Sequence, residues 1–456
     1  MDSATIAARL ERLPATRSMW WRIILISFGG FFEFYDMFLS AYVGPGLVKA
    51  GILTPTTPGL FGTEGLAGFV AAFFMGLFIG TAVFSVVADR FGRRAIFTTS
   101  LLWYTVAATV MAFQTTAFGL DLWRFIAGIG IGVELVTIDT YIAELVPRHI
   151  RGRAFAFNQV VQFSAIPVVA LLAYLLVPIA PFGLDGWRWL VLAGSSGALV
   201  IWVIRLAVPE SPRWLAHHGR VDEADRIVTA FEQQAQRETG QPLPPVEPAP
   251  FEAPRGSFGE IWRAPYLSRT VMLIVFNLFQ TVGFYGFNNW VPTFLISQGI
   301  ETTKSLGYTF LIAIAAPFGP LLAALFADRI ERKWAIAGAA ACVAVFGLFF
   351  AQMRAPALII LFGALVTLAN NIMSLSFHAY QAELYPTRIR ALAVGFVYSW
   401  SRLSTVFSAF VIAFVLRKAG VGGVFTLIAA SMAVVVLAIG VFGPKVRNLT
   451  LEAISK

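Results

Sequence analysis

The sequence D-R-F-G-R-R at residues 89–94 recurs as D-R-I-E-R-K at residues 328–333, an offset of 239 positions. A second motif, A-E-L-V-P-R-H-I-R-G at residues 143–152, recurs as A-E-L-Y-P-T-R-I-R-A at residues 382–391 with the same offset. Two unrelated motifs rarely share one offset by chance. The chain is therefore predicted to be a duplication of one structural unit.

Long apolar runs flank these motifs. A bilayer core needs about 20 apolar residues per helix, and suitable runs lie near residues 20–43, 66–88, 95–115, 118–143, 154–177, 187–207, 269–297, 304–327, 334–352, 356–382, 392–416 and 421–443. The sequence thus predicts an all-α membrane protein with twelve transmembrane helices in two pseudo-symmetric six-helix bundles. In transporters built from repeats, the substrate binds between the repeats near the bilayer midplane.

The composition excludes a soluble domain. The chain is 58% hydrophobic and 13% charged, whereas a soluble domain carries roughly 25% charged residues. The net charge of +9 does not indicate a nucleic-acid partner, because the basic residues form short clusters between the apolar runs. With both termini in the cytoplasm, all but eight of the 34 Lys and Arg residues lie at cytoplasmic ends or loops, as the positive-inside rule requires. The eight exceptions are Lys49, Arg124, Arg188, Lys304, Arg354, Arg402, Arg417 and Lys418.

Residues 208–268 form one long polar stretch. It begins with P-E-S-P-R-W-L at residues 209–215 and continues with a helical composition. It then contains Q-P-L-P-P-V-E-P-A-P at residues 241–250, which favours an extended linker. The predicted organisation is an N-terminal bundle at 1–207, a cytoplasmic central loop at 208–268 and a C-terminal bundle at 269–456.

The motifs resemble those of the major facilitator superfamily over nearly the whole chain. R-F-I-A-G-I-G-I-G at 124–132, E-L-V-P-R-H-I-R-G-R at 144–153 and P-E-S-P-R-W-L are similar to sugar porters and to the synaptic-vesicle-protein-like group, which includes organic-ion and niacin carriers. F-Y-G-F-N-N-W-V-P-T-F-L at 284–295 is similar to the organic-ion and niacin carriers, and F-F-E-F-Y-D at 31–36 to metabolite–proton symporters. The sugar-porter glutamine signature of span 7 is present only in fragments around Gln280, and P-K-V-R-N replaces the sugar-porter P-E-T-K-G.

Acidic residues inside the spans are the candidates for proton coupling. A charge at the centre of a span costs at least about 2.5–3.5 kcal/mol on insertion scales, so such groups are functional candidates by default. Glu33 and Asp36 are three residues apart and share a helix face, and two neighbouring carboxylates cannot both ionise cheaply at low dielectric. Asp36 is preferred because it lies deeper in its span. Glu134 and Asp139 point about 140° apart on a helix, so only one is expected to face the cavity. The alternative for each acid is a structural ion pair.

Arg402 is the candidate for substrate binding. Its planar guanidinium matches a carboxylate, and the resemblance to aromatic-acid and niacin carriers, which have an arginine in this span, implies the same role. The alternative is a salt bridge from Arg402 to Glu134 or Asp36. Arg124 is expected to snorkel to the membrane interface in a structural role.

Amide and aromatic side chains are predicted to complete the site. Such a wall suits a flat, partly apolar ligand with a polar edge. The candidates are Gln280, Tyr285, Asn288, Asn289 and Trp290 in span 7, Gln159 and Gln162 in span 5, and Asn371 in span 10. Any single amide can equally serve as a hydrogen bond between helices.

The charged loop motifs are predicted to form a gate on the cytoplasmic face. The hypothesis is that ion pairs between the two halves close this face and break when it opens. The candidates are Asp89, Arg93, Glu144, Arg153 and Glu210 in the N-terminal half, and Asp328, Glu383 and Arg390 in the C-terminal half.

The function predicted from these residues and resemblances is proton-coupled uptake of a small organic anion, such as an aromatic or heteroaromatic carboxylate like niacin. A sugar–proton symporter is the alternative, and a drug–proton antiporter is disfavoured because span 5 lacks the glycine-proline signature. A nutrient sensor that binds without transport is a further alternative. The sequence contains no H-E-x-x-H motif that would indicate a metalloprotease. Its single cysteine, Cys342, cannot form a disulfide within the chain, and no group of Cys and His residues has the spacing of metal ligands. The expected partners are a small-molecule substrate, protons and the lipid bilayer, without a cofactor, and the protein is expected to act as a monomer.

Overall fold

The computed structural model describes residues 3–197, 208–246, 257–326 and 329–446. Within these ranges, it does not describe the side chains of residues 61, 83–90, 135–136, 324, 387–388 and 391. The described chain is helical, with one isolated bridge between Pro58 and Glu64. The all-α prediction is therefore confirmed.

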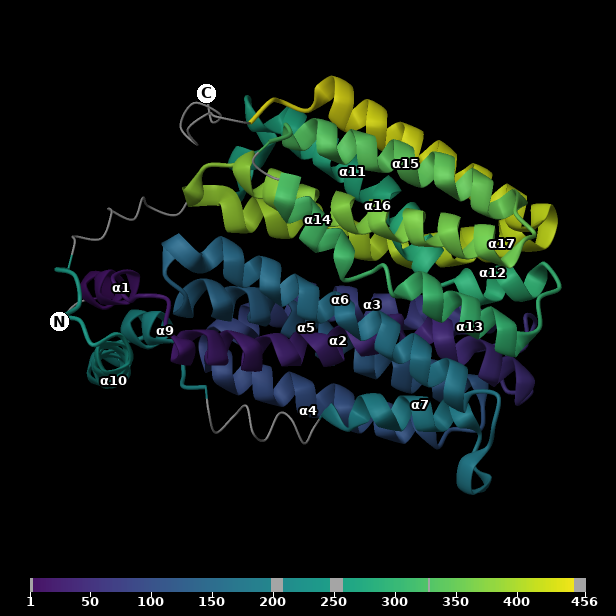
Figure 1. The fold of residues 1–456 in the computed structure, drawn as a ribbon, viewed down its shortest axis with the longest axis horizontal. Helices are drawn as coiled ribbons and strands as arrows, with labels where there is room; N and C mark the ends of the chain where they lie inside the picture. Colours follow the sequence, from purple (N-terminus) through teal and green to yellow (C-terminus); the bar gives the residue numbers. More distant parts are fainter. Residues whose placement is uncertain (1–2, 198–207, 247–256, 327–328, 447–456) are drawn as a thin grey trace.

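The first half of the chain forms one helical bundle, shown in purple to blue in Figure 1. After the short α1 (Ser3–Glu11), it contains α2 (Arg17–Lys49), α3 (Gly65–Phe91), α4 (Arg93–Ala112), α5 (Ala117–Leu145), α6 (Arg148–Leu176) and α7 (Gly186–Ser195). Side-chain oxygens of Thr16 and Thr116 accept backbone hydrogen bonds and cap α2 and α5. Short 3₁₀ turns lie at Leu60–Gly62 and Pro181–Gly183.

The second half forms the other bundle, in green to yellow in Figure 1. Between the halves lie α9 (Pro212–His217), α10 (Val221–Thr239) and a 3₁₀ turn (Phe258–Trp262). The second bundle contains α11 (Tyr266–Asn288), α12 (Val291–Ser297), α13 (Thr302–Ala313), α14 (Phe318–Phe326), α15 (Arg332–Gln352), α16 (Pro356–Glu383) and α17 (Thr387–Phe442).

Ten helices among the described residues are long and apolar enough to cross a membrane. One of them, α17, contains two helices joined at Gly420, where φ of +65° breaks the helical path. Glycine adopts this φ without the steric cost of a Cβ atom. The sixth predicted span begins as α7, and residues 198–207 lie outside the described residues. These positions agree with the twelve predicted spans.

The two ends of the bundle differ in structure. Helices α1, α9 and α10 gather at one end, which we call the near end, and the connection between α12 and α13 lies at the opposite far end (Figure 1). At the near end, Arg9 donates to Glu232 at 2.7 Å and also pairs with Asp225, so α1 is fastened to α10. The helical composition of the central loop therefore does form a helix, and this helix packs against the N-terminal segment.

Glycines allow α3 and α5 to pack closely. A Cβ atom at Gly80 would lie 2.2 Å from the carbonyl oxygen of Ile129, and one at Gly132 would lie 2.3 Å from that of Leu77. Real Cβ atoms do not approach backbone this closely, so these positions require glycine. Small residues at helix contacts are typical of membrane bundles, and this contact gives a structural reason for the glycines of residues 124–132.

Candidate functional site

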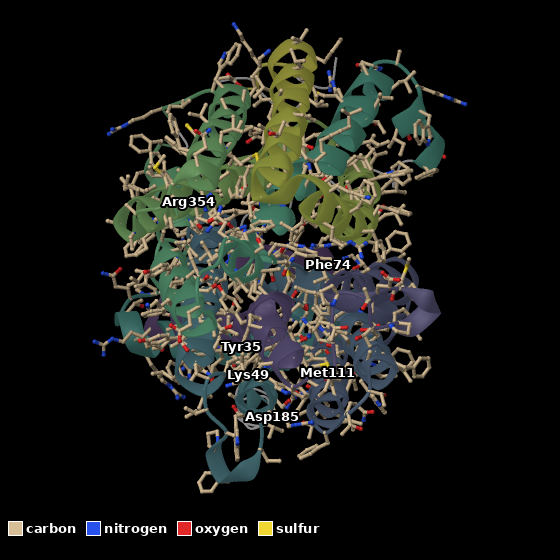
Figure 2. The ribbon with its side chains drawn as sticks, turned by 90° about the vertical axis from the view of Figure 1, so that its right-hand side faces the viewer. Tyr35, Lys49, Phe74, Met111, Asp185 and Arg354 are labelled. Atoms are coloured by element: carbon tan, nitrogen blue, oxygen red, sulfur yellow. The ribbon has the colours of Figure 1, made fainter. Side chains whose placement is uncertain are left out.

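An aromatic cluster lies where the two halves meet. It joins Phe38 of α2, Phe74 of α3 and Phe163 of α6 to Phe284 and Tyr285 of α11, with ring centroids 4.7 Å apart for Phe74 and Tyr285 and 6.5 Å for Phe163 and Phe284. Figure 2 shows Phe74 at the boundary between the two bundles. Of this cluster, only Tyr285 is among the residues predicted from the sequence. Phenylalanines are frequent throughout the spans, so the sequence pattern does not distinguish those at the boundary.

Arg402 of α17 lies beside this cluster and has neutral partners. Its side chain is buried, with 2% of its surface exposed, and it donates hydrogen bonds to the hydroxyl of Tyr285 and, at 3.1 Å, to that of Tyr398. Its guanidinium carbon lies 4.8 Å from the Tyr398 ring centroid. Among the described residues, no carboxylate forms an ion pair with Arg402. A permanently charged, planar donor held by two phenols is suited to bind a carboxylate.

Tyr398 is a site residue that the sequence analysis missed. It precedes Arg402 by four residues, the spacing at which helix side chains meet, and this spacing was the available signal. The ring of His378 packs against the Tyr398 ring with centroids 5.1 Å apart, and the His378 Nδ1 atom lies 3.3 Å from the amide of Gln381. His378 is thus part of the wall behind Arg402.

The acid preferred for coupling, Asp36, is bound to Arg124. The Nη1 atom of Arg124 lies 2.9 Å from Oδ2 of Asp36, and its Nη2 atom donates to the Asp36 carbonyl at 2.5 Å and to the Ser40 hydroxyl at 3.0 Å. The guanidinium carbon also lies 4.1 Å from the Phe73 ring centroid. Arg124 is fully buried, so the expectation that it snorkels to the interface is wrong. A buried charge is tolerated there because Asp36 and these acceptors satisfy it.

Glu33 and Glu134 form a second acidic site. Both side chains are fully buried, and none of their four carboxylate oxygens has a hydrogen-bond partner in the described part of the chain. Glu33 interacts electrostatically with Glu134, Asp139 and Arg402. The side chain of Asp139 is exposed whereas that of Glu134 is fully buried, so the two acids of α5 differ in burial. Neither Glu134 nor Asp36 is hydrogen-bonded to Arg402.

The predicted amides of α11 occupy two kinds of position. Asn288 donates to the Phe284 carbonyl of its own helix at 2.8 Å, whereas Asn289 is fully buried and neither polar atom of its side chain has a partner. Trp290 is buried and stacks on Phe294. Gln280 is half-buried. Asn289 is therefore the amide of this segment with unused hydrogen-bonding capacity.

The amides of α6 and α16 also differ. Gln162 packs against Gly30 of α2, and the side-chain oxygen of Gln159 is buried without a partner. Asn371 donates to the carbonyl of Ala316 at 2.8 Å, between α13 and α14. A carbonyl at a break between helices lacks its usual helical donor. Asn371 thus supplies a hydrogen bond that stabilises this break.

The gate candidates form contacts within each half. Arg93 pairs with Glu144 at 3.0 Å in the first half, and Arg332 pairs with Glu383 at 2.8 Å in the second. Glu210 accepts a hydrogen bond from the backbone N–H of Arg93 at 2.9 Å.

The other gate candidates have separate surroundings. Arg390 donates to the carbonyl of Tyr385 at 3.2 Å, and Arg153 is exposed. The side chain of Asp89 and all of Asp328 lie outside the described residues. The Arg93–Glu144 and Arg332–Glu383 pairs are equivalent under the 239-residue repeat, so the same contact is built once in each half.

Helices of the two halves pack directly on each other. Helix α17 packs on α3, and α13, which lies toward the far end (Figure 1), packs on α6. Arg417 also pairs with Glu64 across the halves at 3.3 Å, with both side chains about half exposed. The aromatic cluster and Arg402 lie on the near side of this contact.

Comparison with known proteins identifies the wider group. Residues 23–456 match the family model described as "Sugar (and other) transporter". The chain is 29% identical to the niacin transporter NiaP of Acinetobacter baylyi, over 98% of this chain and 99% of that protein. It is 30% identical to the inner membrane metabolite transport protein YdjE of Escherichia coli, over 99% and 98% of the two chains. Its fold is similar to that of the xylose transporter XylE from E. coli in an inward-open conformation, with a TM-score of 0.75 and 20% identity over 96% of this chain and 99% of XylE.

Proposed function

The chain belongs to the sugar (and other) transporter family of the major facilitator superfamily, and on this premise we propose that it carries a small organic anion across a membrane together with protons. Transport is by alternating access of a site between the two halves. The substrate is an aromatic or heteroaromatic carboxylate, of which niacin is one example. The similarity to a protein named as a niacin transporter supports this substrate class.

The observation that carries the proposal is the environment of Arg402. This buried cation is held by the hydroxyls of Tyr285 and Tyr398, so its charge is available to a substrate carboxylate. The neighbouring rings of Phe74 and Phe284 offer an apolar surface to an aromatic substrate. Asn289, with its unused amide, supplies a polar group near the end of α11. One cation, a few polar groups and an aromatic wall are typical of sites for small ligands.

The proposal includes sidedness. The distribution of Lys and Arg supports a cytoplasmic position for the near end, with α1, α9 and α10. The protein is then a multi-pass plasma-membrane protein, of the inner membrane if the host is a bacterium. The contacts at the far end would then close the outside, and the pairs Arg93–Glu144 and Arg332–Glu383 would lie at the cytoplasmic gate. We propose that a single chain is the transporting unit.

The test is uptake into proteoliposomes under an imposed pH gradient, acidic outside. Nicotinate, benzoate, a dicarboxylate and a hexose are supplied in turn. The expected result is gradient-driven accumulation of one aromatic carboxylate, which Arg402→Gln abolishes and Arg402→Lys largely loses, since an ammonium lacks the bidentate fork. Arg354→Gln is the matched control, because Arg354 is exposed at the rim of the second bundle (Figure 2) and should transport normally.

A sugar–proton symporter is the second candidate, favoured by the family match and the similarity to XylE. In that case a hexose or pentose accumulates and Arg402→Gln retains transport. This result would refute the anion proposal.

A further inference from the structure

We propose that Glu33 and Glu134 hold one proton between them, and that a substrate carboxylate bound at Arg402 draws a second proton onto the pair. This inference rests on the proposed anion transport and assigns its coupling to a specific pair of residues. The proton site is separate from Asp36, the acid preferred from the sequence, which forms an ion pair with Arg124.

The pair is enclosed by helix packing. A Cβ atom at Gly29, one turn before Glu33, would lie 3.3 Å from a carboxylate oxygen of Glu134 and 2.4 Å from the ring of Phe97. Glycine at this position therefore lets Glu134 of α5 reach α2 close to Glu33, with Phe97 of α4 packed at the same point. Glu33 and Glu134 are both fully buried, and no group in the described chain donates a hydrogen bond to their carboxylates.

A third buried polar group without a hydrogen-bond partner interacts with both acids. Tyr104 of α4 is 1% exposed, its hydroxyl has no hydrogen-bond partner, and it interacts electrostatically with both Glu134 and Glu33. Two negative charges sealed together without a donor or a cation in contact would carry a large desolvation cost. One proton between the carboxyl oxygens reduces the charge from −2 to −1 and supplies a hydrogen bond, so sharing is the favourable arrangement.

The charged and titratable groups around Glu33 set how this proton is exchanged. From α5, Asp139 is exposed and within electrostatic range of Glu33, so it is the acid placed to pass the proton to and from water. From α17, Arg402 and Tyr398 interact electrostatically with Glu33. On α2 itself, Asp36 is neutralised by Arg124.

From the remaining side, α6 presents an amide that does not titrate, Gln162, against Gly30 of α2. Arg402 is therefore the cation that acts on Glu33 without being bound to a carboxylate in the described chain. Its charge favours the ionised form of Glu33.

A substrate anion reverses this balance. A carboxylate bound to Arg402 cancels the positive charge that favours the remaining negative charge on the pair, so the pair takes up a second proton and becomes neutral. By linkage, protonation of the pair strengthens anion binding by the same factor. Proton and anion then bind together and leave together, which is the requirement for symport.

Infrared difference spectroscopy of the purified full-length protein tests the shared proton without any substrate. The wild type is expected to show the band of a protonated buried carboxyl group at neutral pH. Glu33→Gln and Glu134→Gln should each shift this band, and the double variant should remove it. Glu223→Gln, an exposed substitution on α10, is the matched control and should leave the band in place. A band that is absent from the wild type, or unaltered in either single variant, overturns the sharing.

Nicotinate and benzoate binding between pH 5 and 8 tests the link to the anion. Wild-type affinity for the carboxylate that is transported should rise as pH falls, by about tenfold for a coupling of ordinary size, and Glu33→Gln should remove this pH dependence. If Glu33→Gln keeps the wild-type pH dependence, the assignment of coupling is wrong. If the wild type binds neither carboxylate, the proposed function fails, while the infrared result still decides whether the pair shares a proton.

Discussion

Replacing Asp36 by asparagine should strongly destabilise the protein, because it strands the charge of Arg124. The side chain of Arg124 has no exposed surface and that of Asp36 has 4%. After Asp36→Asn, the guanidinium keeps the Asp36 carbonyl, the Ser40 hydroxyl and the Phe73 ring, all of them neutral. Arginine cannot shed its proton, so the uncompensated charge stays in the bilayer interior.

The size of the effect follows from this burial. Removing one partner of a buried ion pair costs about 3–5 kcal/mol, which corresponds to roughly two to four orders of magnitude in the unfolding equilibrium constant. The reverse substitution, Arg124→Gln, should cost less, because an isolated aspartate can take up a proton. The double variant, Asp36→Asn with Arg124→Gln, carries no buried charge at this site and should regain most of the stability lost by Asp36→Asn.

Reversible unfolding of the purified protein in mixed micelles, followed by tryptophan fluorescence, measures these differences. Glu223→Gln is the control, because it breaks a surface ion pair with Arg220. The side chain of Arg220 is 54% exposed and that of Glu223 is 41% exposed, and such exposed pairs contribute only about 0.2–1 kcal/mol to the free energy of unfolding. The expected order of destabilisation is Asp36→Asn, then Arg124→Gln, then the control. The reasoning fails if Asp36→Asn is no less stable than Arg124→Gln, or if the double variant is no more stable than Asp36→Asn alone.

Three further outcomes are expected. Gly80→Ala should lower the free energy of unfolding by about 1–3 kcal/mol, because its Cβ overpacks the α3–α5 contact. Gly338→Ala, whose new Cβ has no atom within 4 Å, should leave the free energy of unfolding unchanged in the same assay. Burial raises the pKa of Glu11 and of Glu232. For Glu11, the backbone N–H of Arg148 and the guanidinium of Arg213 outweigh burial and lower the pKa, and for Glu232 the guanidinium groups of Arg9 and Arg12 do the same. The stability that these carboxylates give α1 is therefore full above about pH 4.3 and is lost as pH falls through the lower folded-state pKa values. Hydrogen exchange at residues 3–11, corrected for the intrinsic rate, should accelerate only in that acidic range, and protection that persists well below it would contradict the prediction. Glu144→Gln combined with Glu383→Gln should keep substrate binding but shift the inward–outward balance, and unchanged labelling of a cysteine introduced at the near end would remove the gate hypothesis.

The ion pairs between α1 and α10 show how the central segment is attached to the rest of the chain. The prolines and glutamates of residues 241–250 predicted an extended linker, and residues 241–246 are indeed outside any helix. The helix before them belongs to the N-terminal half in its contacts, through Arg9, Arg12 and Glu232. These long-range ion pairs have no local sequence signature, since their partners lie more than 200 positions apart.

The sequence by itself determined the membrane solvent, the duplication and the positions of the spans. Apolar runs of bilayer length and two motifs at one 239-residue offset are local, countable features. Because lipid offers no hydrogen-bond partners to the backbone, such apolar runs must form helices. It also selected Glu33, Asp36, Glu134, Asp139 and Arg402 as candidate site residues, because a charge inside a span is rare and costly. The tertiary structure decided how these charges are partnered. Which acid meets Arg124, which pair is left without a donor, and which phenols hold Arg402 depend on how separate helices rotate and pack, and helical spacing within one segment does not specify contacts between segments.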